Sequence, residues 1–188
     1  MDAPKLVYQY RGILVSLPLV FAAVCFYHEV EDYWLIWPLG VTTFVFGLLL
    51  RIWARQHCTY RQEITKHLAA SGPYLLVRNP LYIGNTLMCL GAVILSELLW
   101  LVPITLLNCV LVYSLTVRYE EERLSLRYGE AYRRYMLEVP RWFPRSMHLK
   151  NIGLNKGFLW KSVVTEIPCL LILFPYIVKE VVERWVEH

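Results

Sequence analysis

Residues 80–117 read PLYIGNTLMCLGAVILSELLWLVPITLLNCVLVYSLTV, and Glu97 is the one charged residue among them. A helix that crosses a bilayer needs about 20 apolar residues, so this stretch is too long for one crossing and long enough for two. Ser96 and Glu97 interrupt it near its middle. We therefore expect a tight helical hairpin with its tip at these two residues and spans at about 80–96 and 98–117.

The whole chain has the composition of an integral membrane protein. Its 188 residues are 57% hydrophobic and 18% charged, with a mean hydropathy of +0.41, whereas soluble domains carry about 25% charged residues. Soluble, disordered, collagen-like and nucleic-acid-tail classes are excluded by the same numbers. Three further apolar runs predict spans, at Gly12–Tyr27, Tyr33–Leu50 and Gly157–Val178. We expect the first to be retained as a span, because no small-x-small cleavage site closes it.

Charge in the polar segments predicts how these spans alternate across the membrane. Residues 51–78 and 118–156 are rich in Arg and Lys, whereas the turn at 28–32 and the hairpin tip contain neither. Basic segments stay on the cytoplasmic side. The predicted fold is therefore all-α, a polytopic protein of about five transmembrane helices with its N-terminus and both basic segments at the cytoplasmic face.

A distinctive motif, SGPYLLVRNPLYIGN, occupies residues 71–85 and leads into the hairpin. Gly72-Pro73 predicts a turn, and Asn79-Pro80 predicts a helix start with Asn as N-cap and Pro at the first helical position. The positive end of that helix and the guanidinium of Arg78 then face one small volume, which suits a carboxylate or phosphate. Taken alone, the pattern also fits an interfacial anchor.

The hairpin returns an acidic run, Arg118-Tyr119-Glu120-Glu121-Glu122, to the same membrane face. Carboxylates at the end of a membrane helix are unfavourable unless they are paired or solvated. They either pair with nearby Arg side chains or bind an amino group or ribose hydroxyls of a ligand. The anion seat at Arg78 would lie opposite these carboxylates. A site in which the carboxylates bind a ligand therefore suits a zwitterionic cofactor. The following residues, 118–138, predict an amphipathic helix at the headgroup level, with one apolar stripe.

Two blocks carry a family resemblance. The pattern Gly-Pro-Tyr-x-x-Val-Arg-Asn-Pro-x-Tyr-x-Gly begins at Gly72, and Glu-Glu-x-x-Leu-x-x-x-Tyr-Gly-x-x-Tyr-x-x-Tyr begins at Glu120, followed by Val-Pro-Arg. Over residues 51–145 the chain resembles the isoprenylcysteine carboxyl methyltransferase family and the related phospholipid N-methyltransferases. The resemblance implies a helical membrane enzyme that binds S-adenosylmethionine at the cytoplasmic face, releases S-adenosylhomocysteine and methylates a lipid-borne acceptor.

The resemblance also implies which residues form the site. It assigns cofactor binding to Lys66, His67, Leu68, Ala69, Tyr74, Arg78, Asn79, Pro80, Leu81, Tyr82 and Glu120. Catalytic roles are expected for Glu121, the second acid of the pair, and for Arg118. Two positions depart from the family pattern. The usual Arg-His-Pro is Arg-Asn-Pro here, which removes a His-based proton role, and Thr116 stands where prenylcysteine enzymes place an Arg, with Arg118 two residues later.

The predicted organisation has three parts. Residues 1–50 form two N-terminal transmembrane helices, residues 51–145 form the methyltransferase core with the hairpin at 80–117, and residues 146–188 form a C-terminal loop and the fifth helix.

The expected activity is S-adenosylmethionine-dependent methylation, with carboxyl methylation favoured, of a lipid-like or prenylated acceptor that enters from the bilayer. The alternatives are a phospholipid N-methyltransferase, an NADPH-dependent sterol-type reductase and a non-enzymatic membrane accessory protein. The sequence predicts no metal site and no nucleic-acid partner. It leaves open which acceptor is used and the oligomeric state.

Overall fold

The computed structural model describes residues 3–25, 33–60, 68–144 and 156–186, and these are helical almost throughout, with no strand in the described ranges. The prediction of an all-α protein is confirmed. The elements are α1 (Ala3–Val24), α2 (Tyr33–Tyr60), η2 (Gly72–Leu75), α3 (Pro80–Leu95), α4 (Leu101–Tyr128), α5 (Glu130–Glu138), α6 (Lys156–Leu170), η3 (Leu171–Leu173) and α7 (Phe174–Val186).

Among the described residues, four helical segments are long and apolar enough to cross a membrane: Ala3–Val24, Trp34–Thr59, Leu101–Tyr128 and Phe158–Lys179. The fifth apolar helix, α3, has 16 residues and is therefore about 24 Å long, shorter than the roughly 30 Å hydrocarbon core. Many large apolar side chains on the long helices are exposed, as lipid-facing positions require. The chain is thus a polytopic membrane protein close to the predicted five helices.

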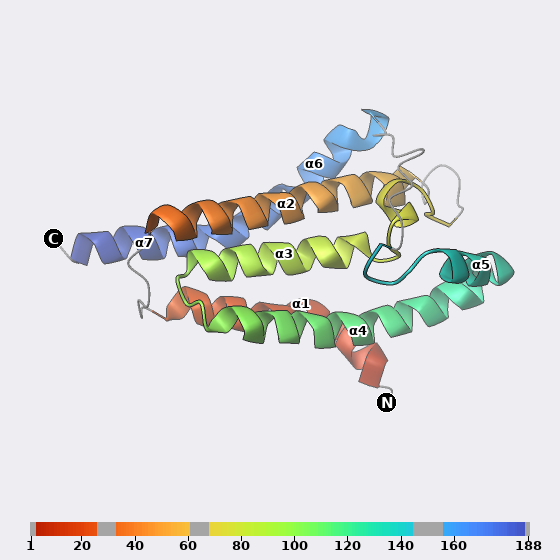
Figure 1. Cartoon of the computed structure of the whole chain (residues 1–188), viewed down its shortest axis with the longest axis horizontal. Helices are drawn as coiled ribbons and strands as arrows, with labels where there is room; N and C mark the ends of the chain where they lie inside the picture. The colour runs from red at the N-terminus through yellow and green to blue at the C-terminus, as the bar shows by residue number, and fades with distance from the viewer. Residues whose placement is uncertain (1–2, 26–32, 61–67, 145–155, 187–188) are drawn as a thin grey trace.

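The helices alternate in direction along the chain (Figure 1). The first residues of α1 and α3 lie at the same end of the bundle as the last residues of α2 and α4, and α5 lies there too. We call this the site end. The turn between α3 and α4 lies at the other end, the hairpin end, and the C-terminal end of α7 lies there as well. Successive helices thus run antiparallel, as consecutive membrane spans do.

Four glycines set the close contact between α2 and α3. Gly40 and Gly47 on α2 face Gly91 and Gly84 on α3, with two helical turns between the members of each pair. A Cβ atom on Gly47 would lie 2.7 Å from the carbonyl oxygen of Gly84, and one on Gly91 would lie 2.6 Å from the backbone nitrogen of Phe44. Small residues let helix backbones approach in membranes, where van der Waals packing drives association.

Polar side chains fasten α1 to two neighbouring helices, α4 and α7. Asn108 of α4 donates from Nδ2 to the carbonyl oxygen of Leu14 in α1 at 3.0 Å, and Tyr176 of α7 donates to the carbonyl oxygen of Leu19 at 2.8 Å. Each bond uses a side-chain donor that would otherwise be costly in hydrocarbon. Together with packed apolar side chains, these bonds fix α1 between α4 and α7.

The hairpin tip matches the predicted position. α3 ends at Leu95 and α4 begins at Leu101, so the turn includes Ser96 and Glu97. Glu97 has a φ of 65° and is buried, and Lys179 of α7 donates to the carbonyl oxygen of Ser96 at 3.2 Å. The turn is therefore covered by the C-terminal helix.

Helix boundaries at the site end differ from the sequence-based expectation. α2 continues past residue 50 to Tyr60, and α4 continues past residue 117 to Tyr128, because apolarity marks where a helix leaves the membrane, not where it stops. The expected amphipathic helix at 118–138 is divided between α4 and α5 at Gly129, whose φ is 56°. Glycine adopts such a backbone conformation without steric penalty.

Candidate functional site

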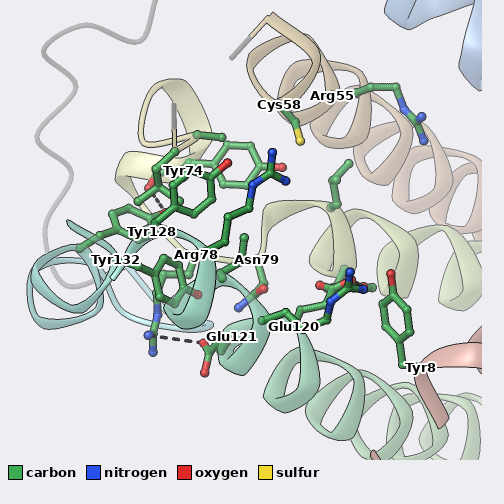
Figure 2. A pocket seen from close by; sticks show the side chains of 18 of the residues that line it. Tyr8, Arg55, Cys58, Tyr74, Arg78, Asn79, Glu120, Glu121, Tyr128 and Tyr132 are labelled. Atoms are coloured by element: carbon green, nitrogen blue, oxygen red, sulfur yellow. Dashed lines mark hydrogen bonds and ion pairs between the residues drawn. The ribbon is translucent and has the colours of Figure 1, made fainter. Parts of the chain in front are cut away.

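A cavity of about 640 Å³ lies at the site end of the bundle. Figure 2 shows side chains from several elements converging on it. Its lining residues are Tyr8, Arg11, Arg51, Arg55, Cys58, Leu68, Ala69, Tyr74, Arg78, Asn79, Leu81, Tyr82, Asn85, Glu120, Glu121, Arg123, Leu124, Arg127, Tyr128, Tyr132 and Tyr135. A volume of 300–1,000 Å³ is typical of sites for small molecules and cofactors.

Most of the site residues expected from the sequence lie together on this cavity. Those lining it are Leu68, Ala69, Tyr74, Arg78, Asn79, Leu81, Tyr82, Glu120 and Glu121. Pro80 is buried at the start of α3 and is not part of the lining. Arg118 is exposed on α4, also outside the lining. Lys66 and His67 lie outside the described residues.

The turn at Gly72 depends on its lack of a side chain. Gly72 has a φ of 59°, and a Cβ atom there would collide with the imidazole ring of His57. The His57 Nδ1 atom is 3.0 Å from the Ser71 hydroxyl oxygen. Tyr74 is therefore held in a buried position between α2 and α5, and Tyr135 donates its hydroxyl hydrogen to the Tyr74 carbonyl oxygen at 2.7 Å.

Hydrogen bonds join the start of α3 to the segment after α5. Asn79 occupies the N-cap position with Pro80 after it, as predicted, but its side chain makes no capping hydrogen bond. Its Nδ2 atom instead donates to the carbonyl oxygen of Arg141 at 3.4 Å, and the backbone nitrogen of Arg78 donates to the carbonyl oxygen of Pro140 at 2.9 Å. These two hydrogen bonds hold the two sequence blocks side by side at the cavity wall.

Glu120 and Glu121 occupy different electrostatic environments. Glu121 is buried. It lies 3.4 Å from Arg78 Nη1 and accepts from Arg141 Nε at 3.1 Å, with a second ion pair to Arg141 Nη2. Glu120 instead accepts a hydrogen bond from the Tyr82 hydroxyl at 2.7 Å. Two guanidinium groups therefore neutralise Glu121, whereas Glu120 presents its carboxylate to the cavity beside a neutral partner.

One nitrogen of Arg78 identifies a place for an anion. Arg78 Nε is buried and makes no hydrogen bond with the described residues, although Nη1 of the same group pairs with Glu121. A buried donor without a partner is unfavourable, and satisfying it is worth about 1–3 kcal/mol. Arg78 lines the cavity near the start of α3 (Figure 2), so its guanidinium group stands at the cavity wall with one donor unpaired.

Tyrosine rings cover the side of the cavity formed by α5 and η2. Tyr74, Tyr128 and Tyr132 lie together there (Figure 2), and Tyr132 and Tyr135 have ring centroids 5.9 Å apart. Burial raises the pKa of Tyr132 to about 12, and burial raises the pKa values of Tyr74 and Tyr135 above the ordinary tyrosine range. These hydroxyls are therefore neutral near pH 7 and serve as hydrogen-bond donors.

Sequence reasoning missed the contributions of α1 and α2 to the cavity. Arg51, Arg55 and Cys58 line it from α2, and Tyr8 and Arg11 line it from α1. The spacing of four and three residues on α2, and of three on α1, places each set on one helix face. That signal is present in the sequence, but it is informative only if both helices continue beyond their apolar runs.

Metal ligation has no candidate cluster in the part of the chain that the structure describes. No group of three or more His, Cys, Asp or Glu side chains there could hold a metal ion.

Comparison with known proteins gives a family match and three relatives. The phospholipid methyltransferase family model matches residues 34–131. The cobalt-zinc-cadmium resistance protein CzcN of Cupriavidus metallidurans is 31% identical, covering 81% of this chain and 77% of its own. The nickel-cobalt-cadmium resistance protein NccN of Alcaligenes xylosoxydans xylosoxydans is 29% identical, covering 80% and 74%.

The third relative is protein-S-isoprenylcysteine O-methyltransferase B of Arabidopsis thaliana, 26% identical over 71% of this chain and 72% of its own. No solved structure matches this chain significantly. The family match covers both sequence blocks as far as Ala131, and so includes the start of α3 and the acidic pair of α4.

Proposed function

Because the chain belongs to the phospholipid methyltransferase family, we propose that it transfers a methyl group from S-adenosylmethionine to a lipid-like acceptor in the cavity at the site end. One observation carries the proposal. The cavity wall combines the guanidinium group of Arg78, whose Nε has no hydrogen-bond partner among the described residues, with the carboxylate of Glu120. A zwitterionic amino-acid moiety needs both an anion seat and a cation seat in one pocket.

The cofactor seat follows from this charge arrangement. Arg78 and the start of α3 would hold the carboxylate of the cofactor, and Glu120 would hold its amino group or ribose hydroxyls. Leu68, Ala69 and Leu81 are apolar parts of the lining that fit the adenosine portion. S-adenosylmethionine, when bound, supplies an electrophilic methyl group on a positively charged sulfur.

The catalytic contribution of the protein would be mainly positional. In an in-line displacement, the acceptor forms its bond to the methyl carbon while the carbon–sulfur bond breaks and its electron pair stays on sulfur. A carboxylate acceptor needs no base, because opposite charges cancel on the way to the transition state. Held geometry and exclusion of water then supply most of the acceleration.

The two glutamates would have separate roles. Glu121 is paired with both Arg78 and Arg141, so we assign it to positioning these guanidinium groups and not to proton transfer. Glu120 holds the cofactor, so the described lining has no second unpaired carboxylate to take a proton from an amine acceptor, and this favours an acceptor that needs no base. Arg118 is not among the residues that line the cavity, so we give it no role in the chemistry.

We place the site end at the cytoplasmic face. The described residues of segments 51–78 and 118–156 lie mainly at this end, and in sequence the two segments hold most of the Arg and Lys residues of the chain, which the positive-inside rule assigns to the cytoplasm. A water-soluble cofactor would then reach the cavity from the cytosol, and the apolar tail of the acceptor would lie in the bilayer.

The test is thermal unfolding of the purified protein with S-adenosylhomocysteine in one arm and NADPH in the other. A ligand that binds the native state raises the midpoint as its concentration rises. We expect a shift with S-adenosylhomocysteine alone. Glu120→Gln should abolish this shift, whereas Glu122→Gln, which changes an exposed neighbour on the same helix, should retain it.

The other outcomes lead to defined alternatives. Stabilisation by NADPH alone would replace the proposal with a reductase, and a response to neither ligand would favour an accessory protein. Between acceptors, the family description names a phospholipid, whereas the Arabidopsis relative is named for O-methylation of isoprenylcysteine. We favour carboxyl methylation, since the cavity offers several guanidinium groups to an anionic acceptor.

A further inference from the structure

A charged cluster joins α2 to α6 inside the bundle. Arg51 donates to Glu166 from Nε at 2.9 Å and from Nη2 at 3.2 Å, and Arg55 Nε pairs with the same carboxylate. Cys169, one turn further along α6, donates its thiol hydrogen to Glu166 at 3.1 Å. The Glu166 side chain is 1% exposed, so this carboxylate is enclosed by its partners.

The two arginines also belong to the cavity wall. Arg51 and Arg55 both line the cavity, whereas Glu166 does not. Gly84 makes room for Arg51, because a Cβ atom on Gly84 would lie 2.7 Å from Arg51 Cγ. Figure 2 shows Arg55 extending from α2 away from Tyr74, so its guanidinium group lies apart from the tyrosine-covered side of the cavity.

The charges in this cluster do not balance. Two guanidinium groups share one carboxylate, which leaves one net positive charge. Arg55 bonds Glu166 through Nε, and its two terminal nitrogens make no hydrogen bond with any residue in the described ranges; the same holds for Arg51 Nη1. The Arg51 side chain is 14% exposed and the Arg55 side chain 36%, so this unbalanced charge lies on the cavity wall, where it favours the arrival of one anion. The unused donors form a fork that matches a carboxylate or phosphate.

We propose that Arg51 and Arg55 bind the anionic head group of the methyl acceptor, a carboxylate or a phosphodiester, and that Glu166 is a positioning residue that holds both guanidinium groups toward the cavity. The assignment of this anion to the acceptor rests on the function proposed above. The seat is separate from Arg78, which we assigned to the cofactor, so two anions are bound in one cavity at two places.

A purely structural role makes a different prediction. If the cluster only fastened α6 to α2, neutralising any of its members would lower stability and leave ligand preference unchanged. If it is an anion seat, removing an arginine weakens binding of anionic lipids. Removing the resident negative charge of Glu166 raises the net charge from one to two and strengthens that binding.

The experiment uses the full chain in phosphatidylcholine nanodiscs and measures midpoint shifts against ligand concentration. The probes are myristate, 1-myristoyl-lysophosphatidylglycerol as a phosphodiester, and methyl myristate as the uncharged control. We expect myristate, the lysophosphatidylglycerol or both to stabilise the wild type, and methyl myristate to have no effect. The anion that stabilises the protein shows whether the seat takes a carboxylate or a phosphodiester. Arg55→Gln should weaken anion affinity at least tenfold, while Arg134→Gln, an exposed control on α5, should match the wild type.

S-adenosylhomocysteine in a parallel arm separates the two proposals. Loss of anion binding in Arg55→Gln with an intact S-adenosylhomocysteine shift supports the seat. Anion affinity within twofold of wild type in this variant, or no anion effect in the wild type, overturns the seat and leaves the methyltransferase proposal standing. If Arg55→Gln does not run as a folded species in gel filtration, Glu166→Gln decides. Several-fold tighter anion binding supports the seat, and unchanged or weaker binding overturns it.

Discussion

Gly47→Ala tests how the close contact between α2 and α3 supports the cavity. The added Cβ atom would lie 2.7 Å from the Gly84 carbonyl oxygen and 2.8 Å from the Met88 backbone nitrogen, while ordinary contacts begin at 3.4 Å. The helices must therefore separate locally by about 0.7 Å, the difference between 3.4 and 2.7 Å. Backbone atoms cannot rotate aside as a flexible side chain can.

The expected loss of stability follows from two opposing terms. Overpacking typically costs about 1–3 kcal/mol, and replacing glycine by alanine inside a helix returns about 1 kcal/mol. The net destabilisation relative to the wild type is therefore about 0–2 kcal/mol, and relative to a glycine-to-alanine change without a clash it is about 1–3 kcal/mol. The displacement would also separate Arg51 on α2 from Tyr82 on α3 and from Arg78, which lies just before α3, so affinity for S-adenosylhomocysteine should fall as well.

Thermal unfolding in nanodiscs, with and without S-adenosylhomocysteine, measures both effects. The matched control is Gly12→Ala, because a Cβ atom on Gly12 has no neighbour within 4 Å. This variant should equal or exceed the wild type in stability, since it gains helix propensity with no clash. The reasoning is refuted if Gly47→Ala unfolds at the same midpoint as Gly12→Ala.

Three further predictions concern the site. Glu121→Gln should lower stability by about 2–3 kcal/mol in thermal unfolding, because it leaves Arg78 and Arg141 without their shared counter-ion; a smaller effect than that of Glu122→Gln would contradict the ion-pair account. Folding raises the pKa of Tyr132 from 10 to about 12, so its contribution to stability is complete below pH 10 and is lost as the pH rises toward 12. Tyr132→Phe should flatten this alkaline loss in unfolding measured against pH, and an unchanged slope would argue against it. Arg118→Gln should leave S-adenosylhomocysteine affinity within twofold, as measured by midpoint shift, whereas a tenfold loss would return Arg118 to the site.

The acidic pair illustrates what sequence and structure each contribute to the site. The sequence indicates that carboxylates at 120 and 121 return to the face that carries Asn79-Pro80. It does not distinguish the two, because neighbouring residues on a helix point about 100° apart and their partners come from elsewhere in the chain. The structure separates them: Tyr82 of α3 contacts Glu120, whereas Arg141, beyond α5, contacts Glu121.

Hydropathy alone determined the all-α class, the approximate spans and the hairpin tip at Ser96–Glu97, because the hydrocarbon core imposes a length and an apolarity that are local properties of the chain. Tertiary structure alone decided that Arg51 meets Glu166, 115 residues away, and that polar faces of α1 and α2 complete the cavity. These pairings depend on which helices lie side by side and on the close approach that four glycines permit between α2 and α3. Helix packing in lipid is set by such shape matching and not by the apolar pattern, which is similar on every span.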